Sequence, residues 1–313
     1  MSSSTPPRSE GSQGQVGVLM ALAAFGWWAW VTPLYFHLLD AIPASEQLAW
    51  RVISGLPAML LILLLGRKFS QFTAILRSPR VLLLLTCSAL LLSVNWFTFT
   101  WAVINQRLVE GSFGYYINPL VSVLLGALFL GERLRGLQAI AVAIAVVGVA
   151  VNAVALGSLP WISLIIAFSF GFYGLIRKQV QAAPGPGISV EMLMMLPVMI
   201  MVLVFTYREP GGTPHTTWFW TLLVLAGPQT VLPLLFYTGA ARRITLSTLG
   251  LLQFIAPTGQ LLLAVLAFGE SFTSGQAWAF ALIWIAVILY SIDTWRRSRL
   301  TDRPDPRNLP EVD

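Results

Sequence analysis

Five carboxamide side chains lie deep inside long apolar stretches of the chain: Asn95, Asn118, Gln229, Gln253 and Gln260. Polar side chains are costly in an apolar environment, so within such stretches they tend to face a bundle interior or a cavity. The carboxamides could contact a small polar ligand. They could instead hydrogen-bond between helices, which contributes about 0.6 kcal/mol on average.

Arg51 is the one basic residue well inside an apolar stretch. It lies roughly 10 Å along a helix axis from the start of that stretch, at about 1.5 Å per residue. An arginine at this depth costs up to about 3 kcal/mol unless it finds a partner. Glu46 and Glu110 open stretches on the same side and are candidate partners. Arg51 is therefore interpreted as an anion-binding or gating residue, or as half of a structural ion pair.

Aromatic residues share the same stretches, and an aromatic-lined cavity could stack planar or amphipathic ligands. Packing between helices is the alternative for each of them. The predicted ligand-contacting set combines aromatic and carboxamide side chains: Trp28, Asn95, Trp96, Trp101, Tyr115, Tyr116, Asn118, Tyr173 and Gln253.

Catalytic and metal-binding patterns are missing from the sequence. His37 and His215 have no second ligand at metal spacing, and there is no Gly-x-Ser-x-Gly, Cys-x-x-Cys or Walker sequence. We therefore expect no enzyme activity, no cofactor, no metal and no ATP-driven step within this chain. The single cysteine, Cys87, excludes an internal disulfide.

The composition is that of an integral membrane protein. Of 313 residues, 57% are apolar and 10% charged, and the mean hydropathy is +0.76. Soluble domains carry about 25% charged residues. A spanning helix needs about 20 mostly apolar residues. Ten segments satisfy this: 16–39, 44–66, 80–104, 109–130, 134–154, 158–178, 188–207, 217–240, 246–268 and 273–295.

Basic residues predict the orientation of these spans. Of the 19 lysines and arginines, sixteen fall on the side of the N-terminus, whereas only Arg107 and Arg208 fall on the other and Arg51 lies within a span. Cytoplasmic loops carry the excess of basic residues. Both termini are therefore expected in the cytoplasm, with the protein in the inner (plasma) membrane, and the net charge of +6 indicates topology rather than nucleic-acid binding.

The two halves of the chain repeat. Pro119 and Pro257 each stand twelve residues before a Gly-Glu pair, which ends in Glu132 or Glu270. Glu46 and Glu191 open the second span of each half. Because five spans are an odd number, the second copy must be inverted, and such folds place substrate near the midplane between the halves. We expect repeats at 15–154 and 157–296, disordered cytoplasmic tails at 1–14 and 298–313, helix breaks at both prolines, and solvated carboxylates at Glu132 and Glu270.

The sequence resembles the EamA family of the drug/metabolite transporter superfamily, and within it the RarD group. The resemblance runs from about residue 17 to 295. It is carried by Arg51-Val52-Ile53, Asn95-Trp96, Trp101-Ala102-Val103, Gly114 to Leu120, Gly131-Glu132-Arg133, Gly157 to Pro160, Ala167 to Phe170 with Tyr173-Gly174-Leu175, and Leu246 to Gly250. It implies an all-α membrane protein of ten helices in two inverted five-helix repeats.

These observations predict a secondary transporter for small organic molecules that works outward from the cytoplasm. A passive channel and, less favoured, an intramembrane enzyme are the alternatives. Proton coupling could use Glu46, Glu110 or Glu191, whereas a uniporter would need none of them. The partners expected are a small-molecule substrate and the lipid bilayer, without nucleic acid.

Overall fold

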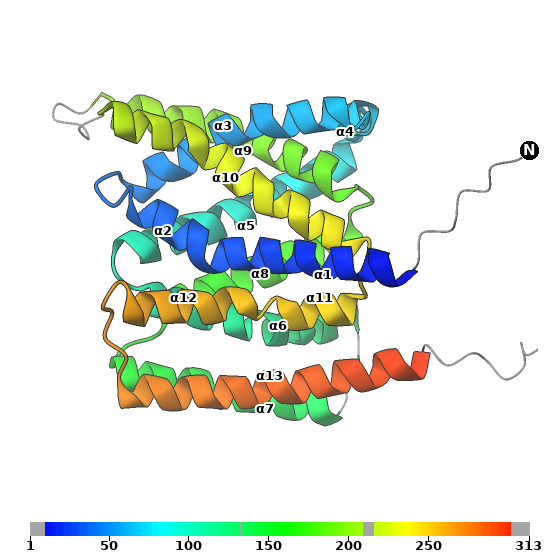
Figure 1. Ribbon diagram of the computed structural model, residues 1–313, viewed down its shortest axis with the longest axis vertical. Helices are drawn as coiled ribbons and strands as arrows, with labels where there is room; N and C mark the ends of the chain where they lie inside the picture. The colour runs from blue at the N-terminus through cyan, green and yellow to red at the C-terminus, as the bar shows by residue number, and fades with distance from the viewer. Residues whose placement is uncertain (1–9, 132, 135, 209–215, 302–313) are drawn as a thin grey trace, which may run out of the picture.

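The computed structural model describes residues 10–131, 133–134, 136–208 and 216–301, and this part of the chain is helical throughout apart from its connections (Figure 1). Ten of its segments are long and apolar enough to cross a membrane, which confirms the predicted number. In hydrocarbon every backbone N–H and C=O must be satisfied internally, so long apolar segments form helices.

The first half of the chain supplies five spans. They are α1 with η1 and α2 (Glu10–Gly26, Trp27–Val31 and Thr32–His37), α3 (Ala44–Leu65), α5 (Pro79–Ile104), α6 (Leu108–Leu130) and α7 (Gly136–Leu156). A short helix that the sequence analysis missed, α4 (Phe69–Leu76), joins α3 to α5. Phe72 and Ile75 are its buried residues, and α4 packs on α9.

The second half supplies the other five spans: α8 (Trp161–Gln179), α9 (Pro184–Thr206), α10 (Thr217–Ala241), α11 with α12 (Leu246–Leu252 and Ile255–Leu266) and α13 (Ser274–Thr301). We call the end of the bundle where α1 begins the proximal end and the opposite end the distal end. In Figure 1 the proximal end is on the right, with α4 also there.

Eight spans form a closed circuit of neighbours in the order α1, α10, α3, α9, α5, α8, α6, α12 and back to α1 through η1. The remaining two, α7 and α13, pack on each other and against α6 at one edge of the molecule (Figure 1). Inversion of the repeat maps the α5–α8 contact onto α10–α1, and α5–α9 onto α10–α3. The circuit therefore alternates contributions from the two halves, as two inverted repeats require.

The two predicted helix breaks have different outcomes. Pro119 lies inside α6, which is one helix, so the predicted break there is wrong. Its missing N–H costs one backbone hydrogen bond without ending the helix. Span nine does divide, between α11 and α12 at Gln253 and Phe254, and Pro257 lies in the first turn of α12, where an N–H has no intrahelical partner to lose.

Span one carries a π-helical turn, η1, which packs on α12. Such turns widen a helix locally and leave carbonyls available. The carbonyl of Trp28 accepts a hydrogen bond of 3.1 Å from Gln260 Nε2 on α12. Gly259 permits this approach, because a Cβ there would lie 2.5 Å from the Cβ of Ala29.

The backbones of α3 and α10 touch where Gly55 and Gly227 meet. A Cβ on Gly227 would overlap the backbone of Gly55, and the N–H of Gly227 donates to Ser54 Oγ at 2.9 Å. Small residues let membrane helices approach this closely. The contact joins the first repeat to the second.

Replacing Gly227 with alanine should lower the free energy of unfolding by about 1–3 kcal/mol, because the methyl group has no room between two backbones. Thermal unfolding of the full-length protein in detergent measures the change. Gly174→Ala in α8 is the matched control, since nothing lies within 4 Å of a Cβ there. Equal stability of Gly227→Ala and the wild type would contradict the close approach.

Candidate functional site

Arg51 lies about two turns into α3 from the distal end and contacts α2 and α5. The residue is 5% exposed, and its Cζ is 4.0 Å from the ring centre of Trp96 and 5.3 Å from that of Phe36. The Nε and Nη1 groups are buried without an acceptor. Within the described part of the chain, Arg51 forms no ion pair.

The partners predicted for Arg51 are engaged elsewhere, so that pairing is wrong. Glu46 accepts a hydrogen bond of 2.7 Å from the Tyr207 hydroxyl. Glu110 pairs with Arg107, whose Nε lies 2.5 Å from Oε1. Both carboxylates sit in the first turn of their helices, nearer the distal end, and Arg51 extends instead toward aromatic rings.

Asn95 forms a link between the repeats. Its Nδ2 donates to the carbonyl of Ile166 at 3.0 Å and to Ser169 Oγ at 3.2 Å, both on α8, and its Oδ1 accepts from the Tyr115 hydroxyl at 3.1 Å. With these bonds the amide holds α5, α6 and α8 together. Asn95 and Tyr115 lie near Arg51: Asn95 directly precedes Trp96, which the guanidinium contacts, and it accepts from the Tyr115 hydroxyl.

Asn118 follows Tyr115 by three residues, so the two share one face of α6. Asn118 is 9% exposed, and its Oδ1 is buried without a donor. An unsatisfied amide in the membrane interior is costly. The orphan oxygen of Asn118 is thus available to a ligand, as the two donors of Arg51 are.

Tyr116 and Gln253 belong to another part of the molecule. The hydroxyls of Tyr116 and Thr258 lie 2.6 Å apart, and the Tyr116 ring stacks on Phe254. They line an open apolar groove of about 700 Å³ between α6, the α11–α12 break and α13, with the exposed Trp284 and Ile288 on its α13 side. Gln253 is half-buried at the end of α11, next to this groove.

The remaining predicted residues are also dispersed. Trp28 packs with Phe25 and Tyr237. Trp101 packs on Trp161 and Arg107 at the distal end of α5. The predicted ligand-contacting set is thus divided among several places. The structure brings Asn95, Trp96 and Tyr115 together near Arg51, and Asn118 lies one turn of α6 from Tyr115.

Glu191 is the centre of a polar cluster in the proximal half. It is fully buried on α9 and accepts from Ser88 Oγ at 2.5 Å and from the Tyr173 hydroxyl at 3.4 Å. Arg177 Nη1 lies 3.7 Å from the Glu191 Oε1 atom. The cluster joins α5, α8 and α9, so Tyr173 contacts a carboxylate rather than the Arg51 region.

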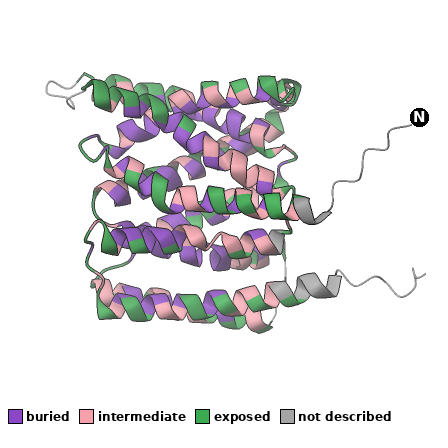
Figure 2. Ribbon diagram, in the orientation of Figure 1, coloured by how far each residue is buried: buried purple, intermediate pink, exposed green. Residues whose placement is uncertain are grey.

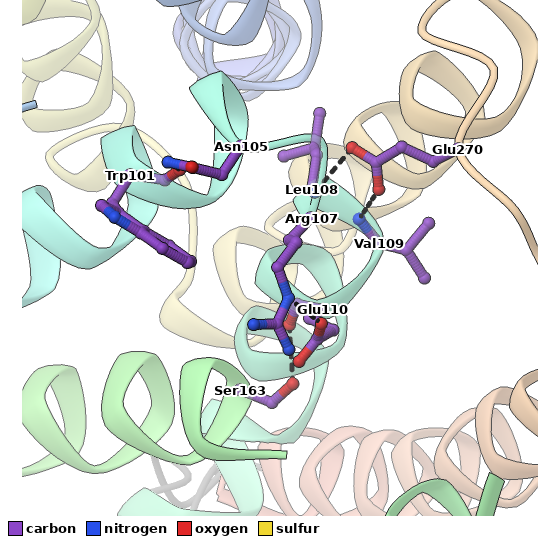
Figure 3. Close-up of polar contacts among 8 residues, drawn as sticks. All are labelled: Trp101, Asn105, Arg107, Leu108, Val109, Glu110, Ser163 and Glu270. Atoms are coloured by element: carbon purple, nitrogen blue, oxygen red, sulfur yellow. Dashed lines mark hydrogen bonds and ion pairs between the residues drawn. The ribbon is translucent and has the colours of Figure 1, made fainter. Parts of the chain in front are cut away.

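Glu270 closes the distal end by capping a helix of the other repeat (Figure 3). Its Oε1 and Oε2 accept from the backbone N–H groups of Leu108 and Val109 at 2.7 and 2.8 Å. The expectation of a solvated carboxylate is wrong here, because Glu270 is buried at the positive N-terminus of α6. No local signal identified this cap, which joins positions 162 residues apart. Glu132 lies outside the described residues.

Burial is concentrated around these sites. Figure 2 shows the buried residues gathered in the central helices, whereas α13 is mainly half-buried or exposed. Burial also raises the pKa of the Glu270 carboxyl above its usual 4.5, and the two N–H bonds offset part of that rise.

Glu270→Gln should lower the stability at pH 7 by about 1 kcal/mol, since an amide offers α6 one uncharged acceptor in place of two anionic ones. Because the folded-state pKa of Glu270 is raised, its contribution to stability should grow as the pH falls from 7 toward 4.5. Thermal unfolding at several pH values should therefore show a wild-type advantage over Glu270→Gln that widens on acidification. The exposed Asp40→Asn is the control. An advantage that narrows on acidification would contradict the raised pKa, whereas equal stability at pH 7 would contradict the cap.

Comparison with known proteins identifies the family. The model of the EamA-like transporter family matches residues 15–154 and 159–292. An uncharacterized transporter of Vibrio cholerae is 43% identical, covering 92% of this chain and 95% of that protein. Protein RarD of Escherichia coli is 40% identical, covering 94% and 100%. A solved crystal structure at 20% identity covers 89% of this chain and 98% of its own, with a TM-score of 0.58, and supports the fold. The chain belongs to the EamA-like transporter family.

Proposed function

We propose that this transporter is a secondary carrier that exports small organic metabolites or drugs from the cytoplasm by alternating access. The two repeats share one circuit of eight helices, and polar side chains are buried among them. Relatives over nearly the full length are named as transporters, without a substrate. The distal end is then the outer side, as the basic residues predict.

The observation that carries this proposal is the pair of orphan polar groups at Arg51 and Asn118. A polar group in the membrane interior that has no partner costs free energy, and such groups are typical of substrate pathways. A ligand between the repeats would satisfy both kinds of group, since Arg51 donates and Asn118 accepts. The positioning bonds of Asn95 would keep α5, α6 and α8 in register around that ligand.

A passive channel is the less favoured function. An open pore needs a continuous path of water, whereas Arg51 and Asn118 are at most 9% exposed. The Glu270 cap on α6 and the bond from the Tyr35 hydroxyl to the Leu222 carbonyl both join the repeats toward the distal end. A carrier would break such contacts when it opens outward and remake them when it closes.

If transport is coupled to protons, the proton would be carried by a carboxylate that lies between helices. Glu191 is the best placed, because its partners come from α5 and α8 and a change in its charge would act on both. Glu46 and Glu110 are the alternatives toward the outer side. Uptake measured with and without a pH gradient separates coupled transport from uniport.

Asn118→Ala should reduce counterflow in proteoliposomes at least tenfold, because it removes an orphan acceptor from the proposed site while leaving the helix intact. Labelled amino acids, nucleosides and amphenicol-type drugs form the substrate panel, and the wild type should exchange at least one of them saturably. A flux without saturation or counterflow would indicate a channel.

Asn105→Ala is the matched control, since Asn105 is exposed and its Nδ2 bonds only the carbonyl of Trp101 at the end of α5. This variant should transport like the wild type. Wild-type flux in a folded Asn118→Ala protein would contradict the proposed site.

A further inference from the structure

We propose that Arg51 binds the carboxylate of the substrate, so that the carrier transports small organic acids whose apolar part packs on Trp96 and Phe36. This inference rests on the proposed function and specifies the substrate class of the same site. It starts from a charge that the structure leaves without a counter-ion.

The guanidinium of Arg51 is a buried cation in a membrane-spanning helix. A buried charge without a partner is strongly destabilising, because its lost hydration is not replaced. The aromatic faces of Trp96 and Phe36 supply cation–π contacts at 4.0 and 5.3 Å. Those contacts leave the Nε and Nη1 hydrogens without acceptors, so they replace only part of the hydration.

The protein does not supply the missing anion within the described residues. Glu110 pairs with Arg107, and Glu191 lies near Arg177 in the proximal half. Glu270 caps α6, and Glu46 accepts from Tyr207. Each of these carboxylates is engaged away from Arg51, and a diffusible anion is the remaining counter-ion.

The two neighbouring phenols do not compete for this anion. The Tyr115 hydroxyl donates to Asn95, and the Tyr35 hydroxyl donates to the Leu222 carbonyl. Their single protons are committed to the protein, so Arg51 alone offers free donors at this place. A guanidinium binds carboxylates with a planar pair of N–H groups.

The aromatic rings beside Arg51 indicate the chemistry of the rest of the ligand. Trp96 is 8% exposed and Phe36 is fully buried, and both present ring faces beside the guanidinium. A highly hydrated dianion such as inorganic phosphate would lose its water against these rings. When the site opens to admit substrate, a monocarboxylate with an aromatic or aliphatic body would bury that body against them.

Thermal unfolding of the full-length protein in detergent, with added phenylacetate, tests the inference. A ligand that binds only the folded state raises the melting temperature in a saturable way. Phenylacetate should do so, whereas its neutral analogue phenylacetamide should act at least tenfold more weakly. Arg51→Gln and Arg51→Met should abolish the phenylacetate response. Arg80→Gln, which removes an exposed charge at the start of α5, should keep it.

The stability of the Arg51 variants without ligand is a second measurement. Without ligand, Arg51→Met should be at least as stable as the wild type, because it removes an unpaired buried charge. Loss of folding in both Arg51 variants would show a structural role and overturn the proposal. It would equally be overturned by equal responses to the acid and the amide, by a response to phosphate alone, by no response to phenylacetate, or by an unchanged response in Arg51→Gln.

Counterflow separates this inference from the proposed function. Arg51-dependent binding of phenylacetate without any saturable exchange would contradict the carrier and leave the carboxylate site standing. Saturable exchange of neutral solutes that Arg51→Gln leaves unchanged would support the carrier and overturn the carboxylate site.

Discussion

A polar group placed in hydrocarbon has no water to bond, and its partner must come from the protein or from a ligand. This constraint makes every span helical, since a helix satisfies its own backbone. It also decides where the helices meet. Asn95 bonds α8, Gln229 bonds Thr32 at 2.8 Å and Gln260 bonds the Trp28 carbonyl, so each of these carboxamides connects the two repeats. Arg51 and Asn118 are among the buried polar groups left without a partner, and they form the proposed binding site.

The connections between the repeats are of two kinds, and they differ in how readily they could be exchanged. At Gly55 and Gly227 the backbones of α3 and α10 touch directly. The two helices therefore cannot move closer together there. The cap from Glu270 to α6 depends on two hydrogen bonds at the distal end, which a helix end can exchange for water. In the proposed carrier, the two repeats would rock about the first contact while the second opens.

Irregular backbone occurs in span one and in span nine. The π-turn of span one packs on α12, and the Trp28 carbonyl within that turn receives the Gln260 side chain. The break between α11 and α12 lies beside the open groove lined by Phe254 and Thr258. Non-helical backbone at membrane depth is tolerated only where protein or a cavity covers it. The π-turn belongs to the surface between the repeats, whereas the α11–α12 break adjoins a groove lined by α6 and α13.

The number of spans, the order of the repeats and the fold class could be predicted from the sequence by itself. Span formation depends on local apolar length, and the paired Gly-Glu and proline positions survive as a pattern along the chain. Which side chains meet was decided only by the tertiary structure. Asn118 and Tyr116 are two residues apart yet face different neighbours, Trp101 lies at the distal end, and Glu270 caps a helix 162 positions away. The rotation of each helix about its axis and the identity of its neighbours are set by packing between distant segments, and no local pattern encodes them.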